Sequence, residues 1–501
     1  MFTSFGSLAL AQSLAEEGAS PSPCCAMMSD TSKDTSFDYM AALAQSAIPK
    51  NAASFFVQAV NQPSPLVAIN VKRPQNPGSV IKMITSFIAL KTYGADYRWT
   101  TSFLSEGRPD ANGVLHEPLY LKGSGDPQLV IEKIDELTQN LTKAGVKQID
   151  APILIDRSIF KDEKQDAASF DGEPDMPYNA QPDAALMNYR ALNFQFEPST
   201  KQVTLVPWLL GYALHNNVQW VDGPCPNGGW KSTLSLNVND TGANIGGRYY
   251  SGCGVQSWHF HAHRMSANDY ARGVLAGLMS SADGLSASIP SRGNILDSAT
   301  SPTPARPVWT QPQVLDGKTP HNAQVLASVQ SAPLAEELRD MNHFSNNVMA
   351  RQIYLSFSVK EKQQGNLPES EAFVHRQLAA QGLTLKSLHM GNGSGLSRIN
   401  QVSASDLGKM LIKSSSDEAF VNSLARLGIE GTVKNRLKDT DMVGRARLKT
   451  GTLNDVRAIA GYVDGKSGTR YVVVSIIQDI NAQTPAGKRV HDVFLQWVGA
   501  Q

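Results

Sequence analysis

The side chains that could do chemistry in this chain lie in three short motifs that are far apart in the sequence. They occupy residues 79–82, 345–347 and 449–452 and supply hydroxyls, primary amines and an amide. Such groups can act as a nucleophile, a base, a proton relay and an anchor for a carboxylate, which are the parts that acyl transfer through a serine requires. Each motif alone recurs by chance, so the combination carries the prediction.

The first motif places Ser79 three positions before Lys82. Apolar residues over 81–88 follow a loop at 73–78, and this pattern predicts a helix whose first turn contains Ser79. Residues three apart share a helix face, so the Lys82 amine could take the Ser79 proton while it is neutral. Burial and a nearby cation such as Lys449 would both favour a neutral amine. A plain helix cap beside a solvated lysine is the alternative interpretation.

The second motif, Ser345 and Asn347, falls in a break between helices predicted over 334–341 and 348–355. A hydroxyl placed there could relay a proton to a leaving amine, and the amide could hold Lys82 and the substrate backbone. The alternative is simple capping, in which Ser345 satisfies the first turn of the second helix.

The third motif lies inside a strand predicted over 445–453, the first of three strands in an antiparallel meander. Gly451 would allow a substrate backbone to approach closely, while Lys449 and Thr450 could bind a terminal carboxylate. Thr452 could offer a backbone N–H to an oxyanion, beside the N–H of Ser79 at its helix start. An ordinary exposed lysine on a strand is the alternative for this motif alone.

The three motifs resemble those of the penicillin-binding proteins and serine β-lactamases, on the segments 76–82, 341–347 and 448–452. Two further segments, 119–127 and 393–398, resemble signatures of the three-domain D-alanyl-D-alanine carboxypeptidases/endopeptidases, and the similarity covers nearly the whole chain from Asp38. The resemblance implies catalytic roles for Ser79 as nucleophile, Lys82 as base, and Ser345 with Asn347 as relay and support. It implies a carboxylate site at Lys449 and Thr450, and the residue properties described above add Gly451 and Thr452 to the predicted substrate-binding set.

The resemblance also implies the fold class and the domain organisation. We expect an α+β fold in which a serine β-lactamase/transpeptidase-like catalytic domain, with helices around an antiparallel sheet, is interrupted by two smaller β-rich domains. The long gap between Ser79 and Ser345 leaves room for both insertions. The expected divisions are a signal-like or flexible leader at 1–37, a catalytic domain at 38–100 and 326–501, an inserted domain II at 101–190 and 258–325, and an inserted domain III at 191–257.

One position departs from the family pattern. Asn392 stands where these enzymes usually have Asp before the Gly-Ser-Gly-Leu segment. An amide keeps the hydrogen bonding of that position but not the charge, so a structural role survives and a role that depends on charge is in doubt.

Composition limits the partners. Lys plus Arg and Asp plus Glu number 45 each among 501 residues, and no long run of one sign occurs, which argues against nucleic acid as a partner. The sequence contains no run of about 18 apolar residues, the length that a membrane-spanning helix needs, so no membrane span is predicted. Residues 2–11 are mildly apolar and end in Ala9-Leu10-Ala11, which is compatible with a secretory signal or with a leader of no function.

The cysteines and histidines leave two questions open. Cys225 and Cys253 each lie in a Gly-rich turn, and they either form a disulfide in an oxidising compartment or are unrelated thiols. Cys24 and Cys25 are assigned no role.

Three histidines alternate along one segment: His259, His261 and His263. They could bind zinc or belong to a polar strand, and we favour the strand because no Asp or Cys stands at a recognised spacing. No metal or other cofactor is expected.

The resemblance and the motifs together predict a periplasmic serine peptidase that acts on peptidoglycan stem peptides through an acyl-enzyme at Ser79. It would release a terminal D-alanine, cut a D-amino-acid cross-link, or do both, and β-lactams would stay attached to it. The alternatives are a serine β-lactamase or esterase, and a β-lactam-binding cell-wall protein without turnover. Whether the chain forms a homodimer stays open.

Overall fold

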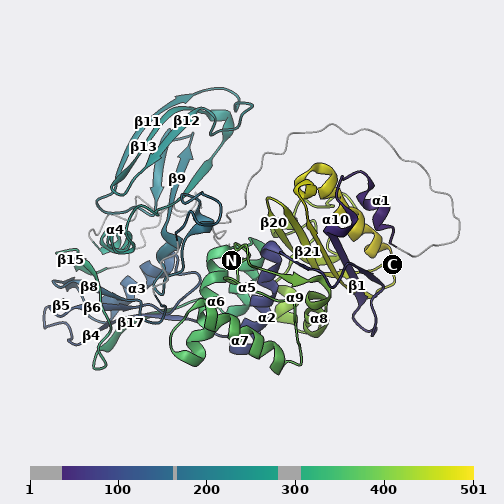
Figure 1. Ribbon diagram of the computed structural model, residues 1–501. Helices are drawn as coiled ribbons and strands as arrows, with labels where there is room; N and C mark the ends of the chain where they lie inside the picture. Colours follow the sequence, from purple (N-terminus) through teal and green to yellow (C-terminus); the bar gives the residue numbers. More distant parts are fainter. Residues whose placement is uncertain (1–36, 162–165, 280–305) are drawn as a thin grey trace. The chain divides into compact units, whose positions relative to one another are not determined.

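The structure, a computed structural model, describes residues 37–161, 166–279 and 306–501 (Figure 1). The predicted leader at 1–37, including Cys24 and Cys25, therefore lies almost wholly outside the described residues. The chain divides into two compact units. The terminal unit comprises the described residues of Met1–Ala95, Leu338–Asn347 and Val374–Gln501, and the middle unit those of Asp96–Glu337 and Val348–Phe373.

The terminal unit is built on a six-stranded antiparallel sheet with the order β19-β20-β21-β22-β1-β2. Its long strands are rich in Val, Ile and Ala, and β22 is buried along almost its whole length, as expected of a sheet covered on both faces. The strands are β1 (Ala53–Ala59), β2 (Val67–Ile69), β19 (Ala425–Arg426), β20 (Ala446–Leu453), β21 (Val456–Asp464) and β22 (Arg470–Gln478).

Helices cover both faces of this sheet. Neighbouring residues of a strand point to opposite faces, and on β1 Phe55 packs against Phe494 of α10 (Pro485–Ala500) with their ring centroids 5.2 Å apart. Phe56 faces the other way, where Gly408 of α8 (Ala404–Ser414) leaves room for its ring. The other helices that lie wholly or partly in this unit are α1 (Tyr39–Ala44), α2 (Lys82–Tyr93), α5 (Leu334–His343), α6 (Asn347–Lys362), α7 (Leu367–Ala380) and α9 (Glu418–Asn422).

The middle unit contains a five-stranded mixed sheet with the order β16-β8-β6-β4-β17 and three sheets of three strands each. The five strands are β16 (Val314–Asp316), β8 (Ile153–Asp156), β6 (Leu119–Lys122), β4 (Thr100–Ser105) and β17 (Gln324–Gln330). The smaller sheets are formed by β5 (Val114–Leu115), β7 (Gln148–Ile149), β9 (Ala191–Glu197), β10 (Gln202–Val206), β11 (Ala213–Val221), β12 (Leu234–Val238), β13 (Gly242–Tyr250), β14 (Gln256–His261) and β15 (Val308–Trp309).

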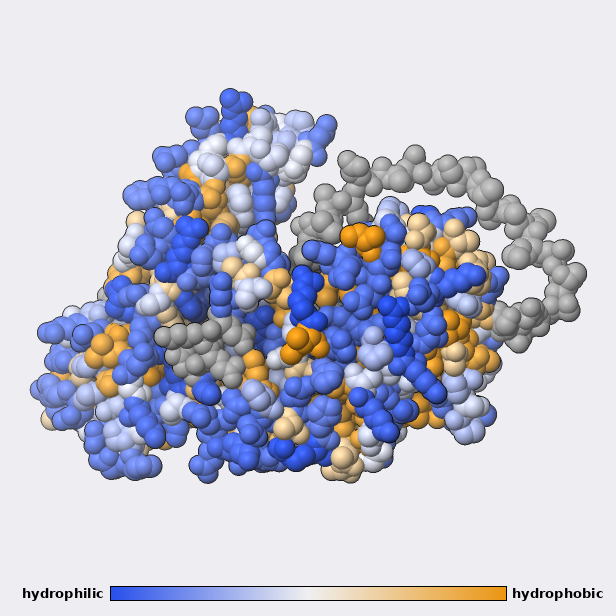
Figure 2. Space-filling model, viewed as in Figure 1, coloured by the Kyte–Doolittle hydropathy of each residue, from blue (hydrophilic) through white to orange (hydrophobic). Residues whose placement is uncertain are grey.

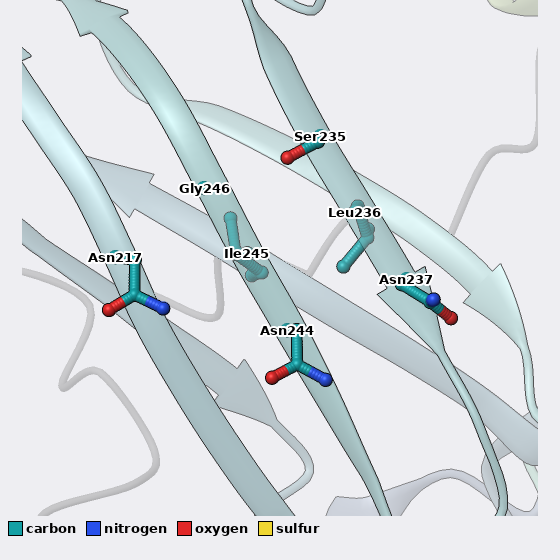
Figure 3. Close-up of a pocket in the computed structure, with 7 residues that line it drawn as sticks. All are labelled: Asn217, Ser235, Leu236, Asn237, Asn244, Ile245 and Gly246. Atoms are coloured by element: carbon teal, nitrogen blue, oxygen red, sulfur yellow. The ribbon is translucent and has the colours of Figure 1, made fainter.

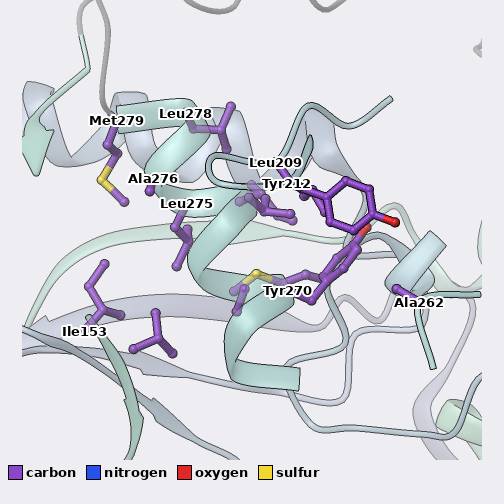
Figure 4. Close-up of a cluster of buried hydrophobic side chains, with 14 of the residues drawn as sticks. Ile153, Leu209, Tyr212, Ala262, Tyr270, Leu275, Ala276, Leu278 and Met279 are labelled. Carbon is purple, nitrogen blue, oxygen red and sulfur yellow. The ribbon is translucent and has the colours of Figure 1, made fainter. Parts of the chain in front are cut away.

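One cluster of buried apolar side chains runs through the middle unit. Figure 4 shows part of it, where Tyr270 and Leu275 of α4 (Ala267–Met279) lie among residues such as Ile153 and Leu209. The helix α3 (Ile131–Lys143) contributes its amphipathic face to the same cluster. This cluster includes residues of both predicted inserted domains, II (101–190 and 258–325) and III (191–257). A shared core does not separate the two domains, so the boundaries at 191 and 257 stay a prediction.

A pocket of about 260 Å³ lies on the three-stranded sheet β11-β13-β12 (Figure 3). The amides of Asn217, Asn244 and Asn237 come from three neighbouring strands around it. At one end of these strands a disulfide joins Cys225 to Cys253, with their Cα atoms 4.6 Å apart, so the bond that the sequence left open is present. The motif residues 79–82, 345–347 and 449–452 do not line this pocket.

The face of the molecule seen in Figure 2 is mostly hydrophilic, with hydrophobic residues in small groups. Individual exposed apolar side chains include Ile399 and Ile480, which are 64% and 78% exposed. Across the described ranges, the helices are all too short or too polar to span a lipid bilayer.

Candidate active site

The first motif forms the predicted helix start. Residues Gly78–Ile81 make a 3-10 turn, η2, that continues directly into α2 at Lys82. Gly78 has a φ of +51°, a left-handed conformation that suits glycine. The turn points the partly buried Ser79 hydroxyl at the lysine one turn later, and Lys82 Nζ donates to Ser79 Oγ at 3.0 Å.

Lys82 is fully buried, and two further acceptors hold its amine. Lys82 Nζ donates to Asn347 Oδ1 at 2.6 Å and to the carbonyl oxygen of Ser394. A buried amine needs such partners, since an unpaired polar group in the interior costs several kcal/mol. Asn347 and Ser394 therefore direct the amine at the Ser79 hydroxyl, in the geometry that a general base for a serine requires.

Ser345 lies where α5 ends, with a φ of +55° that is unusual for a residue with a side chain. The next N–H, of Asn346, donates back to the Met341 carbonyl at 2.9 Å, which is the Schellman pattern of a helix C-terminus. The Ser345 hydroxyl accepts a hydrogen bond from Lys449 Nζ at 2.9 Å. The Ser345 hydroxyl is thus bonded to a residue of the third motif. In the capping alternative it would instead have accepted from a backbone N–H in the first turn of α6.

Lys449 lies in the middle of β20, opposite Ala460 of β21, and is fully buried. Besides the bond to Ser345, its Nζ donates to the Thr450 carbonyl at 2.8 Å. Burial lowers the pKa of Lys449 to about 7, because the interior disfavours the charged amine. Both charge states are therefore accessible near neutral pH, and the amine can either attract a carboxylate or take part in proton transfer.

Glycines bring the backbone of β20 against the turn that carries Ser79. A Cβ at Gly451 would lie 2.2 Å from the Pro77 carbonyl oxygen and 3.0 Å from the Ser79 nitrogen, so only glycine fits there. A Cβ at Gly78 would lie 3.2 Å from the Thr452 nitrogen. The N–H groups of Ser79 and Thr452 are therefore near one another, as the two donors of an oxyanion hole must be.

The segment around Asn392 supplies the carbonyl that contacts Lys82. Asn392 Oδ1 accepts from Ser394 N at 3.2 Å and from Ser394 Oγ at 2.9 Å, while its Nδ2 donates to the Leu396 carbonyl at 2.7 Å. An aspartate could not make that last donation. In this chain the amide has a structural role, since it fixes the turn that positions the Ser394 carbonyl.

The sequence did not identify two groups at this site. The Ser394 carbonyl is a backbone atom, and no side-chain pattern marks it, although the 393–398 segment had been singled out. Thr432, from a turn not assigned to any motif, lies with its Oγ1 2.8 Å from Thr450 Oγ1. Two threonine hydroxyls that are 18 residues apart give no signal in a single sequence.

The three histidines do not converge on one point. His261 Nδ1 lies 3.0 Å from the Pro174 carbonyl, and His263 Nε2 lies 2.9 Å from Asp175 Oδ1. In the part of the chain that the structure describes, no three His, Cys, Asp or Glu side chains are grouped as a metal site requires.

Comparison with known proteins identifies the family. A model of the D-Ala-D-Ala carboxypeptidase 3 (S13) family matches residues 38–228 and 308–500. The chain belongs to this family. The chain is also 26% identical over 410 residues to a D-alanyl-D-alanine carboxypeptidase from Actinomadura sp., covering 78% of this chain and 71% of the relative. It is 24% identical over 434 residues to the D-alanyl-D-alanine carboxypeptidase DacB from Haemophilus influenzae, covering 84% of each.

Solved structures show the same fold. The structure of penicillin binding protein 4 from Haemophilus influenzae has a TM-score of 0.71 at 19% identity, over 93% of this chain and 98% of that one. That protein has also been solved complexed with a β-lactam. A predatory peptidoglycan endopeptidase from Bdellovibrio bacteriovorus has a TM-score of 0.54 at 16% identity, over 90% of this chain and 92% of that one.

These matches confirm both the family resemblance that the motifs indicated and the predicted fold class. The S13 chain is a serine hydrolase of the low-molecular-mass penicillin-binding protein type. The roles of the individual site residues stay predictions, supported by the geometry described above.

Replacing Gly451 by alanine should disable the site. The new Cβ must displace the backbone near Ser79 and Thr452, and the loss of one oxyanion donor lowers kcat by about 100- to 1,000-fold. We expect the rate of acylation by a fluorescent penicillin to fall by a factor in this range. Gly246→Ala is the matched control, since its nearest neighbour would be an ordinary 3.4 Å away. Acylation of Gly451→Ala at the wild-type rate would contradict the placement of the turn.

The buried Lys449 should make stability depend on pH. Its pKa is about 7 in the folded protein and about 10.4 in an unfolded chain. Between these values the unfolded chain binds more protons, so the folded state loses stability as the pH falls from about 10 to 7. The free energy of unfolding that Lys449→Met gains over wild type should be larger at pH 6 than at pH 9 by about 1–3 kcal/mol. Denaturant titrations at both pH values measure this, and an equal gain at both would show that Lys449 is not buried as a neutral amine.

Proposed function

We propose that this protein is a serine-type D-Ala-D-Ala carboxypeptidase and endopeptidase that acts on peptidoglycan stem peptides through an acyl-enzyme at Ser79. The observation that carries the proposal is the cluster in which Lys82 Nζ meets Ser79 Oγ, with Asn347 and Ser394 as its other acceptors. Membership of the S13 family and the carboxypeptidase and endopeptidase names of its relatives support the substrate class.

Acylation follows from these contacts. Lys82, as a neutral amine, takes the Ser79 proton while Oγ attacks the carbonyl carbon of the penultimate D-alanine. The N–H groups of Ser79 and Thr452 stabilise the negative charge that develops on the carbonyl oxygen. The peptide C–N bond then breaks, and the proton that Lys82 took passes to the leaving amine through the Ser345 hydroxyl, which Lys449 contacts. Lys82 is thereby neutral again before deacylation begins.

Deacylation uses the same groups, with water in place of the Ser79 hydroxyl as the nucleophile. Water attacks the Ser79 ester with Lys82 as base, and the proton returns to Oγ, so the cycle consumes one water for each peptide bond. A β-lactam has an amide in the equivalent position, but its leaving amine stays tethered after the ring opens. The tethered group obstructs water, so the ester persists and the antibiotic inhibits covalently.

Lys449 and Thr450 are the proposed site for the terminal carboxylate. The Lys449 amine is the charged group, and Thr450, the following residue of β20, has a hydroxyl that can donate a hydrogen bond. In an endopeptidase reaction the same site would accept the carboxylate of the cross-linked D-amino acid, whose side-chain amine becomes the leaving group. One active site can therefore serve both reactions.

We also propose a periplasmic location. The disulfide between Cys225 and Cys253 is of a kind that persists in oxidising compartments, and the substrate lies outside the cytoplasm. A homodimer stays a prediction that light scattering on the purified protein can decide.

Release of D-alanine from a pentapeptide muropeptide tests this function. Wild type should release it, and Ser79→Ala should release none while it remains folded, because alanine removes only a half-buried hydroxyl and Lys82 keeps its acceptors on Asn347 and Ser394. A cross-linked muropeptide dimer, incubated in parallel, should be converted to monomers.

Three results would contradict the proposal. Labelling by penicillin without any release of D-alanine or monomers would indicate a β-lactam-binding protein without turnover. Rapid and sustained nitrocefin hydrolysis would indicate a β-lactamase. Equal activity of wild type and Ser79→Ala would exclude Ser79 as the nucleophile.

A further inference from the structure

A threonine outside all of the motifs touches the proposed carboxylate site. Thr432 belongs to a 3-10 turn, η6 (Gly431–Val433), and its Oγ1 lies 2.8 Å from Oγ1 of Thr450. Either hydroxyl could be the donor in this bond. Thr432 is exposed and Thr450 is partly buried, so the pair lies where a bound group could reach it.

The fold holds the η6 turn tightly in place. Gly431 has a φ of +53°, and a Cβ there would lie 2.4 Å from the carbonyl oxygen of His343, two residues before Ser345. Gly428 N donates to the Val433 carbonyl at 3.0 Å and closes the loop. The turn that carries Thr432 is therefore packed against the helix end that leads into the second motif, which limits how far its hydroxyl can move.

Glu430 ties the same turn to the strand next to β20. Its carboxylate accepts from the Arg426 guanidinium at 2.8 Å and from the Arg426 backbone N–H at 3.2 Å. Arg426 is the last residue of β19 and pairs with Arg447 of β20, two residues before Lys449. Thr432 is thus held from two sides, by α5 and by the sheet.

We propose that Thr432 is a positioning residue that orients the Thr450 hydroxyl toward the carboxylate of the substrate. A hydroxyl has one proton to donate. If Thr432 donates to Thr450, the Thr450 proton is free for the carboxylate, and the two bonds strengthen each other along the chain of hydroxyls. This inference rests on the proposed function, since it names a residue that determines how the proposed carboxylate site selects its ligand.

The inference separates ligands by one chemical group. A ligand with a free carboxylate should benefit from Thr432, and one in which that carboxylate is esterified should not. Loss of a neutral hydrogen bond costs about 2- to 10-fold in an equilibrium or rate. The exposed position of Thr432 predicts little effect on folding.

The test compares acylation of the full chain by benzylpenicillin and by its methyl ester, for wild type, Thr432→Val and Thr432→Ser. Valine has the shape of threonine without the hydroxyl, and serine keeps the hydroxyl. For Thr432→Val we expect the second-order acylation constant for benzylpenicillin to fall about 3- to 10-fold, with that for the ester unchanged within about twofold. Thr432→Ser should stay within about threefold of wild type for both.

A double-mutant cycle with Thr450→Val completes the test. If Thr432 acts through Thr450, its substitution should have no further effect once the Thr450 hydroxyl is gone. An equal loss for both ligands, or an unchanged loss in the Thr450→Val background, would overturn the inference. Acylation rates do not depend on D-alanine release, so a failure of the proposed peptidase activity would be seen separately in the muropeptide assay.

Discussion

Burial of the Lys82 amine is the constraint on which the rest of the site depends. An amine removed from water must find acceptors, and it is stable in the interior only when they are supplied. Here the acceptors come from Asn347 and Ser394, which are 265 and 312 residues away in the sequence. The helix α2, the start of α6 and the 392–396 segment must therefore all be in place before Lys82 can meet Ser79. Activation of the nucleophile is in this way coupled to completion of the fold.

The second buried amine, Lys449, extends this arrangement to β20. It joins Ser345 to the strand, while Gly451 lets that strand approach the Ser79 turn closely. Several of these features are costly in isolation: a positive φ at Ser345, a lysine with a pKa lowered to about 7, and glycine within a strand. Strain and desolvation of this kind gather at functional sites, where the surrounding structure compensates for them.

The sequence predicted the local features of the site well and the long-range ones only by resemblance. Spacing and apolar periodicity placed Ser79 at a helix start, Ser345 between two helices and Lys449 inside a strand, because these depend on neighbouring residues. Nothing local shows that the Ser394 carbonyl meets Lys82, or that Thr432 meets Thr450, since such contacts depend on how distant segments pack. The disulfide stayed undecided for the same reason: turns can be recognised, but the 4.6 Å between the Cα atoms of Cys225 and Cys253 cannot.

Mass spectrometry of the penicillin adduct tests the central claim most directly. Cleavage by trypsin after Lys72 and Lys82 yields the peptide 73–82, in which Ser79 is the only hydroxyl-bearing side chain. After incubation with benzylpenicillin, the mass of one antibiotic molecule should be found on this peptide and on no other. An adduct on a different peptide, with 73–82 unmodified, would contradict the assignment of Ser79 as the nucleophile that Lys82 activates.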